Sequence, residues 1–158
     1  MTTSTTTLTT LSDEEVSISR VLDAPRPLVF AAHTEPDYVS QWLLGPEHWT
    51  MPVCEIDLRP GGSWHYVWRY QDGTEMEMRG DFCEVEAPAR IVHTERWGDE
   101  WPETLHTVLF AEQDGKTTVT RIVRYPSRDD RDAALATGMM SGVERSFELL
   151  DVLLAKAL

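Results

Sequence analysis

Apolar and polar residues alternate along most of the chain, which is the pattern of β-strands with one buried face. One such run follows the N-terminal segment. The others come after residue 51 and are separated only by short segments rich in Gly, Pro and Asp, which predicts an antiparallel meander. The predicted sheet has about six to seven strands, drawn from residues 16–22, 52–58, 62–70, 74–85, 90–97, 105–111 and 117–125.

Two segments depart from this alternation and predict helices, which makes the fold class α+β. In residues 27–44, a proline stands where each of two short helices can begin, and apolar residues follow on one side. From Ser127, a suitable N-cap, apolar residues recur at three and four positions to the end of the chain. An unbroken helix there would be about 45 Å long at 1.5 Å per residue. Two glycines, Gly138 and Gly142, would leave a bare patch on one of its faces.

The segment SWHYVWRY sets the register of one strand pair. Its rings at alternate positions share one strand face: Trp64, Tyr66, Trp68 and Tyr70. A two-residue turn would place these rings opposite charged residues, whereas a three-residue loop pairs Trp68 with Met76. The same register pairs Tyr66 with Met78, and Gly73 supplies the left-handed residue that such a loop needs. The outer face then collects charged side chains: Arg69, Glu75, Glu77 and Arg79.

Length and charge restrict the class of protein. A chain of 158 residues is long enough for one domain with its own core, which we place at residues 14–158. The Thr-rich residues 1–13 lack apolar periodicity and are expected to form a disordered tail. The formal net charge of −13 disfavours nucleic acid and membrane surfaces as partners. Without a signal segment or a long apolar run, and with Cys54 and Cys83 expected to be free, the protein is interpreted as cytoplasmic.

Six segments together carry a resemblance to a known family: APRPLVFAAHTEPDYVSQWLLGP, CEIDLRPGGSWHYVWRYQDG, HTERW, LHTVLF, DGKTTVTRIVRY and GMMSGVERSFELLDVLLA. The chain resembles, from about Ile18 to Leu158, the activator of Hsp90 ATPase homologue (AHSA1-like) family of the START-like, or SRPBCC, superfamily. This resemblance implies the helix-grip (Bet v 1-like) fold, a curved antiparallel sheet wrapped around a long C-terminal helix with an elongated cavity between them. Many members carry Trp-Trp-Gly-Pro where this chain has Trp42-Leu43-Leu44-Gly45-Pro46.

The resemblance and the aromatic strand together predict a binding site for a small apolar or aromatic molecule. Rings and thioethers of this kind suit an adaptable apolar pocket. The sheet wall would consist of Trp64, Tyr66, Trp68, Met76, Met78 and Phe82. The helix wall would consist of Met139, Gly142, Val143 and Phe147. We expect no metal and no cofactor, because the five histidines show no metal-ligand spacing, and we expect a monomer or a weak homodimer.

The sequence is also compatible with two other functions. The same cavity would suit an enzyme of the cyclase or hydratase type if one acid or base faced inward, the candidates being His93, Glu95, His106 and Arg121. Burial disfavours the charged form of a carboxyl or imidazole and can bring its pKa near neutral pH. The sequence leaves the facing of these four residues open, since their strands have apolar residues in both parities. A chaperone-interacting module is the third hypothesis, and a chaperone partner is the least favoured because too few residues precede residue 16 for the additional domain of the eukaryotic activators.

Overall fold

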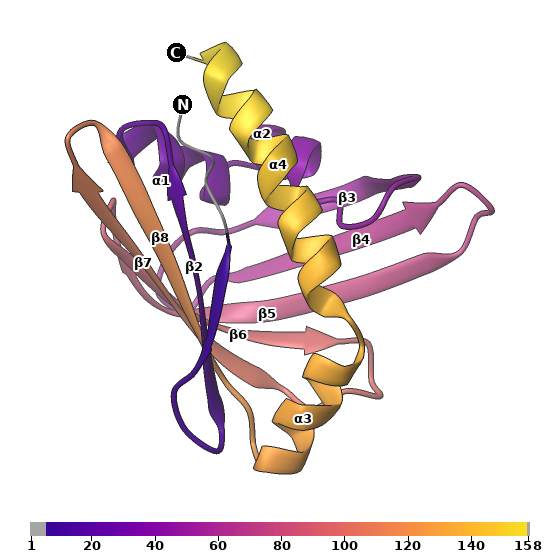
Figure 1. Ribbon diagram of the computed structural model, residues 1–158. Coiled ribbons are helices and arrows are strands. Elements are labelled where there is room, and N and C mark those ends of the chain that lie inside the picture. Colours follow the sequence, from indigo (N-terminus) through magenta and orange to yellow (C-terminus); the bar gives the residue numbers. More distant parts are fainter. Residues whose placement is uncertain (1–5, 158) are drawn as a thin grey trace.

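An open antiparallel sheet forms the centre of the computed structural model, which describes residues 6–157 (Figure 1). Within this part of the chain the sheet has eight strands in the order β1-β2-β8-β7-β6-β5-β4-β3. Their bounds are β1 Thr7–Thr10, β2 Glu15–Leu22, β3 Trp49–Ile56, β4 Ser63–Tyr70, β5 Glu75–Glu86, β6 Arg90–Trp97, β7 Thr104–Gln113 and β8 Lys116–Arg124. From β3 to β8 the strands pair in chain order, as predicted for a meander, and β2 closes against β8.

Four helices accompany the sheet in the described residues: α1 Arg26–Thr34, α2 Pro36–Trp42, α3 Arg128–Ala136 and α4 Met139–Ala157. Figure 1 shows α4 running across the curved sheet, with the short helices α1 and α2 near one end of it. Both short helices begin with a proline in their first turn and contact α4. This arrangement is the α+β helix-grip fold that the sequence predicted.

The C-terminal helix is not continuous, contrary to the prediction of a single long helix. Helix α3 is capped by Ser127, whose Oγ accepts a hydrogen bond from the Asp130 amide at 3.1 Å, and it ends before Gly138. Gly138 has φ of +76°, a left-handed conformation that commonly ends helices. The break lets the two helices cover different parts of the sheet. Helix α3 packs on a small cluster around Val16 and Tyr125, while α4, about 28 Å long at 1.5 Å per residue, packs on the main core.

The Thr-rich N-terminal segment is partly structured, which corrects the prediction of a disordered tail over residues 1–13. Residues 7–10 form strand β1 and pair with β2, while residues 1–5 lie outside the described part. The four residues of β1 are all exposed, so no apolar periodicity marks them. Pairing at a sheet edge needs only backbone groups, and β-branched threonine suits a strand. The sheet therefore gains a strand beyond the predicted number.

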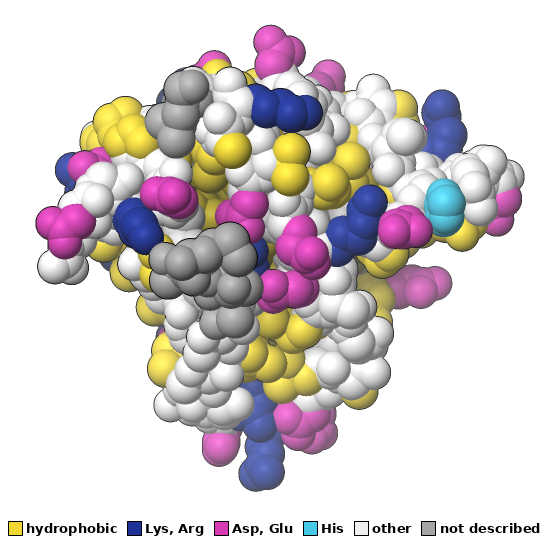
Figure 2. Space-filling view, turned by 45° about the horizontal axis from the view of Figure 1, so that its top comes forward, with side chains coloured by type: hydrophobic (Ala, Val, Ile, Leu, Met, Phe, Trp, Pro, Cys, Tyr) yellow, Lys and Arg dark blue, Asp and Glu magenta, His cyan; other side chains and the backbone are white. Residues whose placement is uncertain are grey.

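The predicted register of β4 and β5 is confirmed. Trp68 pairs with Met76 and Tyr66 with Met78, across a loop closed by a hydrogen bond of 2.8 Å from the Tyr70 amide to the Thr74 carbonyl. On the outer face, Arg69 Nη2 lies 2.6 Å from Glu75 and Arg79 Nη1 lies 2.8 Å from Glu77. Figure 2 shows that acidic side chains are spread over one face of the molecule, with basic ones between them, as expected for a net charge of −13.

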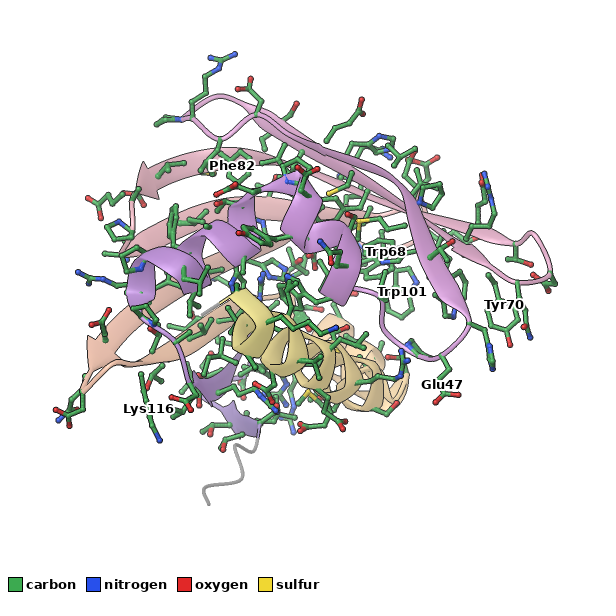
Figure 3. The ribbon with its side chains drawn as sticks, turned by 90° about the horizontal axis from the view of Figure 1, so that it is seen from above. Glu47, Trp68, Tyr70, Phe82, Trp101 and Lys116 are labelled. Atoms are coloured by element: carbon green, nitrogen blue, oxygen red, sulfur yellow. The ribbon has the colours of Figure 1, made fainter. Side chains whose placement is uncertain are left out.

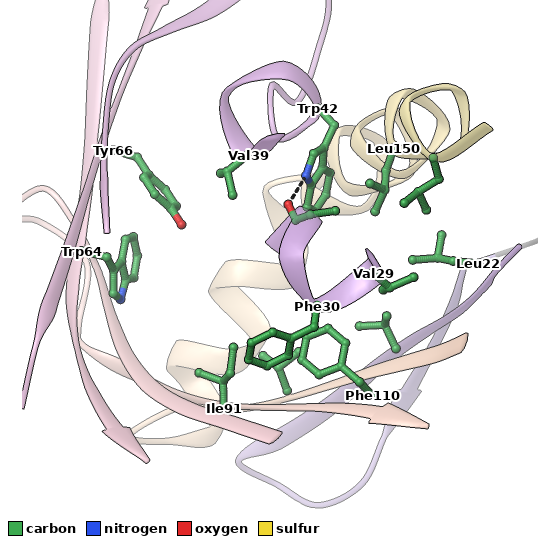
Figure 4. Packing of buried hydrophobic residues seen from close by; sticks show 14 of the residues in the cluster. Leu22, Val29, Phe30, Val39, Trp42, Trp64, Tyr66, Ile91, Phe110 and Leu150 are labelled. Atoms are coloured by element: carbon green, nitrogen blue, oxygen red, sulfur yellow. Dashed lines mark hydrogen bonds between the residues drawn. The ribbon is translucent and has the colours of Figure 1, made fainter. Parts of the chain in front are cut away.

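The main core lies between the sheet and helices α1, α2 and α4 (Figure 4). The rings of Phe30 and Phe110 meet edge to face with centroids 5.1 Å apart. Trp42 donates its indole N–H to the Ala32 carbonyl at 2.8 Å, which fixes the α1–α2 corner. Tyr66 projects its hydroxyl from β4 toward these helices (Figure 4). The inner face of the sheet is thus mainly apolar, which makes any polar residue on it conspicuous.

Candidate functional site

Four polar side chains on neighbouring strands converge on the inner face of the sheet, and they are the four whose facing the sequence left open: His93, Glu95, His106 and Arg121. His93 and Glu95 are two positions apart on β6, so they share a face. His106 on β7 lies directly opposite His93. On β8, Val123 pairs with His106. Arg121 is two positions before Val123, so its side chain lies on the same face. We call these four residues the polar cluster.

Hydrogen bonds join the polar cluster into a chain. Arg121 Nη1 lies 3.2 Å from His93 Nε2 and 3.1 Å from His106 Nδ1, and His106 Nε2 lies 2.9 Å from Glu95 Oε2. A guanidinium only donates, so both imidazole nitrogens that face it accept. The protons then lie on His106 Nε2, which donates to Glu95, and on His93 Nδ1, which donates to the Thr94 carbonyl at 3.0 Å. Both imidazoles are therefore neutral, and they stack with centroids 5.0 Å apart.

The environment of the polar cluster shifts the pKa of three of its members, His93, Glu95 and Arg121. Burial lowers the pKa of His93 to about 3, and the nearby His106 and Arg121 add to this effect. Burial by itself would raise the pKa of Glu95, but His106 and Arg121 outweigh it and lower that pKa to about 2. Burial also lowers the pKa of Arg121, which Glu95 opposes. The expectation that burial brings such a carboxyl near neutral pH is wrong for Glu95, because its cationic and hydrogen-bonding neighbours stabilise the carboxylate.

Aromatic residues of β4 and β5 border the polar cluster. Trp64 meets the His93 ring at a right angle with centroids 5.5 Å apart, and Phe82 lies 6.2 Å from the same ring. The buried members of the predicted sheet wall are Trp64, Tyr66, Trp68, Met78 and Phe82. Met76 was predicted to join them but is 43% exposed. The end of the β4–β5 hairpin extends beyond α4 (Figure 1), and Met76 is the second residue of β5, next to this end.

The residues predicted for the helix wall are all partly buried: Met139, Gly142, Val143 and Phe147. Phe147 stacks on Trp42 with centroids 6.0 Å apart and belongs to the core. A side chain at Gly142 would meet Pro46 at 3.4 Å, so the chain before β3 already occupies the bare patch that the sequence predicted on this helix. Gly142 thus lies beside the loop at a distance that leaves room for a methyl group.

A loop of residues 43–46 is fastened between β4 and α4. Trp68 donates its indole N–H to the Leu43 carbonyl at 2.7 Å. The Gly45 amide donates to Ser146 Oγ at 2.9 Å, and Arg145 Nη1 donates to the Gly45 carbonyl at 3.1 Å. Figure 3 shows Trp68 close to the helices, whereas Tyr70 lies toward the hairpin tip. Trp68 is therefore a structural anchor as well as a wall residue, which its position in the alternating strand alone did not indicate.

Arg20 is a buried charge that sequence reasoning missed. Its side chain is 3% exposed, and its guanidinium bonds Glu144 at 2.8 Å and Asp151 at 2.6 Å, both on α4. The guanidinium also lies 5.4 Å from the centre of the Phe147 ring. The alternation of β2 could have indicated this burial, because Arg20 is two positions after Ile18 and so lies on the same, inward face. These contacts fasten the C-terminal helix to the sheet.

His33 on α1 is a second residue whose role the sequence did not reveal. Its Nδ1 donates to the Val29 carbonyl at 2.8 Å, and its ring lies between Trp42 and Phe110 with centroids 4.9 and 5.3 Å away. Burial lowers the pKa of His33 from 6.5 to about 4, and the charge of Arg121 acts in the same direction. His33 is thus a neutral imidazole in the interior, and its Nε2 is a hydrogen-bond acceptor.

This shifted pKa predicts a loss of stability in mild acid. The unfolded chain takes up a proton at His33 near pH 6.5, whereas the folded protein resists it down to about pH 4. The stabilisation is therefore present above pH 6.5 and is lost as the pH falls toward 4. We expect His33 alone to account for about 2 kcal/mol of the decrease in unfolding free energy between pH 7 and pH 5. Urea titrations of the wild-type protein and of His33→Gln measure this, and equal slopes against pH for the two proteins would contradict it.

Neither a metal site nor a membrane span is found in the described part of the chain. Residues 6–157 contain no group of three or more His, Cys, Asp or Glu side chains placed to hold a metal ion. Among the same residues, none of the helices combines the length and the apolar character that crossing a membrane requires.

Comparison with known proteins identifies the family. The model of the family described as activator of Hsp90 ATPase homolog 1-like protein matches residues 23–155. The chain belongs to this family. A comparison with curated proteins gives no match.

Solved structures agree with this membership in the AHSA1-like family. A crystal structure of a protein from Rhodobacter sphaeroides is 29% identical with a TM-score of 0.92, covering 98% of this chain and 100% of that one. A protein from Mycobacterium smegmatis is 23% identical with a TM-score of 0.84, covering 95% and 97%. The AHSA1 protein from Silicibacter pomeroyi is 20% identical with a TM-score of 0.74, covering 91% and 99%. The family and fold support either a ligand-binding module or a module like the Hsp90 ATPase activators.

Proposed function

We propose that this protein binds a small apolar or aromatic molecule between the inner face of the sheet and helices α1 and α4. One observation carries the proposal: Arg121 and His33 lie deep inside the molecule, and yet neighbouring atoms leave part of the surface of each side chain uncovered. Protein interiors are normally packed without such gaps. A binding site for a ligand with both apolar and polar groups requires accessible polar surface of this kind in the interior.

The neighbouring hydroxyl of Tyr66 supports the same proposal. Tyr66 is 8% exposed, and its ring is held between Trp64 at 4.7 Å and Trp68 at 5.7 Å. Its hydroxyl points into the interior (Figure 4) and has no hydrogen-bond partner among residues 6–157. Buried hydroxyl groups normally have a partner. A bound molecule with a hydroxyl or carbonyl group would supply one.

The hydroxyl of Tyr66 gives a direct test with 2-naphthol as the probe. We expect saturable binding of 2-naphthol to the wild-type protein by isothermal titration calorimetry, and about 5- to 10-fold weaker binding to Tyr66→Phe, the loss of one hydrogen bond. The unfolding free energy should change little, because the hydroxyl has no hydrogen-bond partner to lose among residues 6–157.

Tyr70→Phe is the matched control for this test. It removes the same group from the same strand, but Tyr70 lies toward the hairpin tip (Figure 3). The Tyr70→Phe variant should therefore bind 2-naphthol as tightly as the wild-type protein does. Absence of saturable binding by the wild-type protein would overturn the proposal. Native mass spectrometry of the purified protein then adds an independent readout, since a retained small molecule would appear as an added mass.

A second candidate function is favoured by exposed apolar side chains on the neighbouring strands β5 and β6. Met76 is 43% exposed and Trp97 is 37% exposed, and Trp97 stacks on Trp68 with centroids 5.4 Å apart. Exposed apolar patches of this kind often mark protein contacts. A partner such as Hsp90, to which the family description refers, would dock there. A rise in Hsp90 ATPase rate on addition of this protein, lost in Met76→Glu, would favour this function over ligand binding.

A further inference from the structure

Two arginines face the interior from neighbouring strands, and their surroundings differ. Arg20 on β2 and Arg121 on β8 lie on the same sheet face, since Ile18 pairs with Arg121 and Arg20 follows Ile18 by two positions. Arg20 contacts two carboxylates of α4, at 2.8 and 2.6 Å. Arg121 makes no ion pair with a carboxylate anywhere in residues 6–157. Among the described residues, the Arg20 guanidinium is therefore neutralised by direct contact with carboxylates, whereas the Arg121 guanidinium has no such contact.

The contacts of Arg121 leave most of its donors unused. Within the described residues, only Nη1 donates hydrogen bonds, and both go to neutral imidazoles, those of His93 and His106. The nearest linked carboxylate, Glu95, is reached only through His106, which stands between the two charges. An enclosed guanidinium normally has an anion in contact and partners for its five N–H groups. Arg121 is therefore incomplete as a structural charge.

The groups around Arg121 match a carboxylate attached to an apolar body. The planar guanidinium fork fits the two oxygens of a carboxylate. Tyr66, whose hydroxyl is without a partner among the described residues, packs on Trp64, and Trp64 in turn meets the His93 ring of the polar cluster. The charge of Arg121 acts to lower the pKa of Tyr66. Trp64 and Phe82 flank the same cluster and would contact a ring or chain.

We propose that the interior holds a carboxylate-binding subsite at Arg121, assisted by Tyr66, so that the ligand is an aromatic or apolar carboxylic acid bound as its anion. The subsite rests on the proposed binding function and specifies its ligand class. His106 separates Glu95 from the bound anion, which reduces the repulsion between the two negative charges. A neutral ligand of the same shape would leave Arg121 without a contacting anion and should bind more weakly.

The test compares 2-naphthoate with 2-naphthamide, which have nearly the same shape and differ in charge. Titration calorimetry on the wild-type protein at pH 7 should show 2-naphthoate binding at least about 10-fold more tightly, the range expected for a charge-assisted pair. Arg121→Gln should abolish this preference, and Arg121→Lys should retain part of it, since lysine keeps the charge but not the fork. The ratio of the two affinities is the readout, because partial unfolding weakens both ligands equally.

The outcomes separate this subsite from the proposed function. Equal affinity for the two compounds in the wild-type protein overturns the carboxylate subsite and leaves the binding function standing. Absence of binding by both compounds and by 2-naphthol overturns both. A preference for 2-naphthoate that survives in Arg121→Gln also overturns the assignment to Arg121. If Arg121→Gln does not fold, the wild-type comparison and the folded Arg121→Lys variant still decide the question.

Discussion

Gly80→Ala is expected to lower the free energy of unfolding by about 3 kcal/mol or more, because the added methyl group has no space. A Cβ atom at this position would lie 1.9 Å from the Thr94 carbonyl oxygen and 2.7 Å from Trp64 Nε1. The nearer atom belongs to the backbone of β6, so it cannot move away without displacing the strand. Strands β5 and β6 would have to separate beside His93, so the polar cluster should be disturbed as well. Urea denaturation followed by tryptophan fluorescence measures the effect.

Gly142→Ala is the matched control, and its expected effect has the opposite sign. Gly142 lies inside helix α4, and the nearest atom to an added Cβ would be Pro46 Cδ at 3.4 Å, close to ordinary contact. Alanine in a helix interior is favoured over glycine by about 1 kcal/mol. We expect Gly142→Ala to be neutral or to stabilise the protein by up to that amount. Equal losses in the two variants would show that strand spacing at Gly80 is not the constraint.

Glu95→Gln is expected to destabilise the protein by about 2–3 kcal/mol, because it removes a largely buried hydrogen bond to an ionised carboxylate. The carboxylate has a side chain only 15% exposed and accepts from His106 at 2.9 Å. Its replacement also removes the carboxylate that is linked to the Arg121 cation through His106. Urea denaturation at pH 7 gives the change in unfolding free energy.

Glu75→Gln provides the comparison on the outer face of the same sheet. Glu75 lies 2.6 Å from Arg69, but both side chains are about half exposed. An exposed pair contributes at most about 1 kcal/mol. The same chemical change should therefore have very different effects at the two sites. A small effect at Glu95 would mean that water reaches Arg121 and solvates its charge in place of the lost carboxylate.

Acid titration distinguishes the two variants further. The pKa of Glu95 in the folded protein is about 2, below its ordinary value of 4.5, so its stabilising contribution is present above pH 4.5 and is lost as the pH falls through about 2. Glu95→Gln removes this part of the acid dependence. Glu75→Gln should leave it unchanged.

Several elements were predictable because their sequence pattern has a single solution. The rings of β4 share a face only if the strand is extended, and pairing them with methionines rather than charges requires the three-residue loop that is observed. The two prolines of α1 and α2 likewise mark helix starts. In these segments the local pattern and the global fold agree.

Other elements had no local signal. Strand β1 has four exposed residues and is held by backbone pairing with β2, so its side chains carry no periodicity. The sequence did not predict the break at Gly138, because the apolar residues of α3 and α4 follow one continuous helical spacing. Their separation depends on two different surfaces of the sheet, which the sequence of the helix does not contain.

The sequence by itself determined the family, the meander, the aromatic inner face of β4 and the absence of metal-ligand spacing among its histidines. The tertiary structure alone decided that His93, Glu95, His106 and Arg121 meet, because β6 and β8 carry apolar residues on both faces and the parity of each strand is ambiguous in isolation. It also decided the pKa shifts of His93, Glu95 and Arg121. Burial and charge act between strands that lie far apart along the chain, so their balance exists only once the sheet has formed.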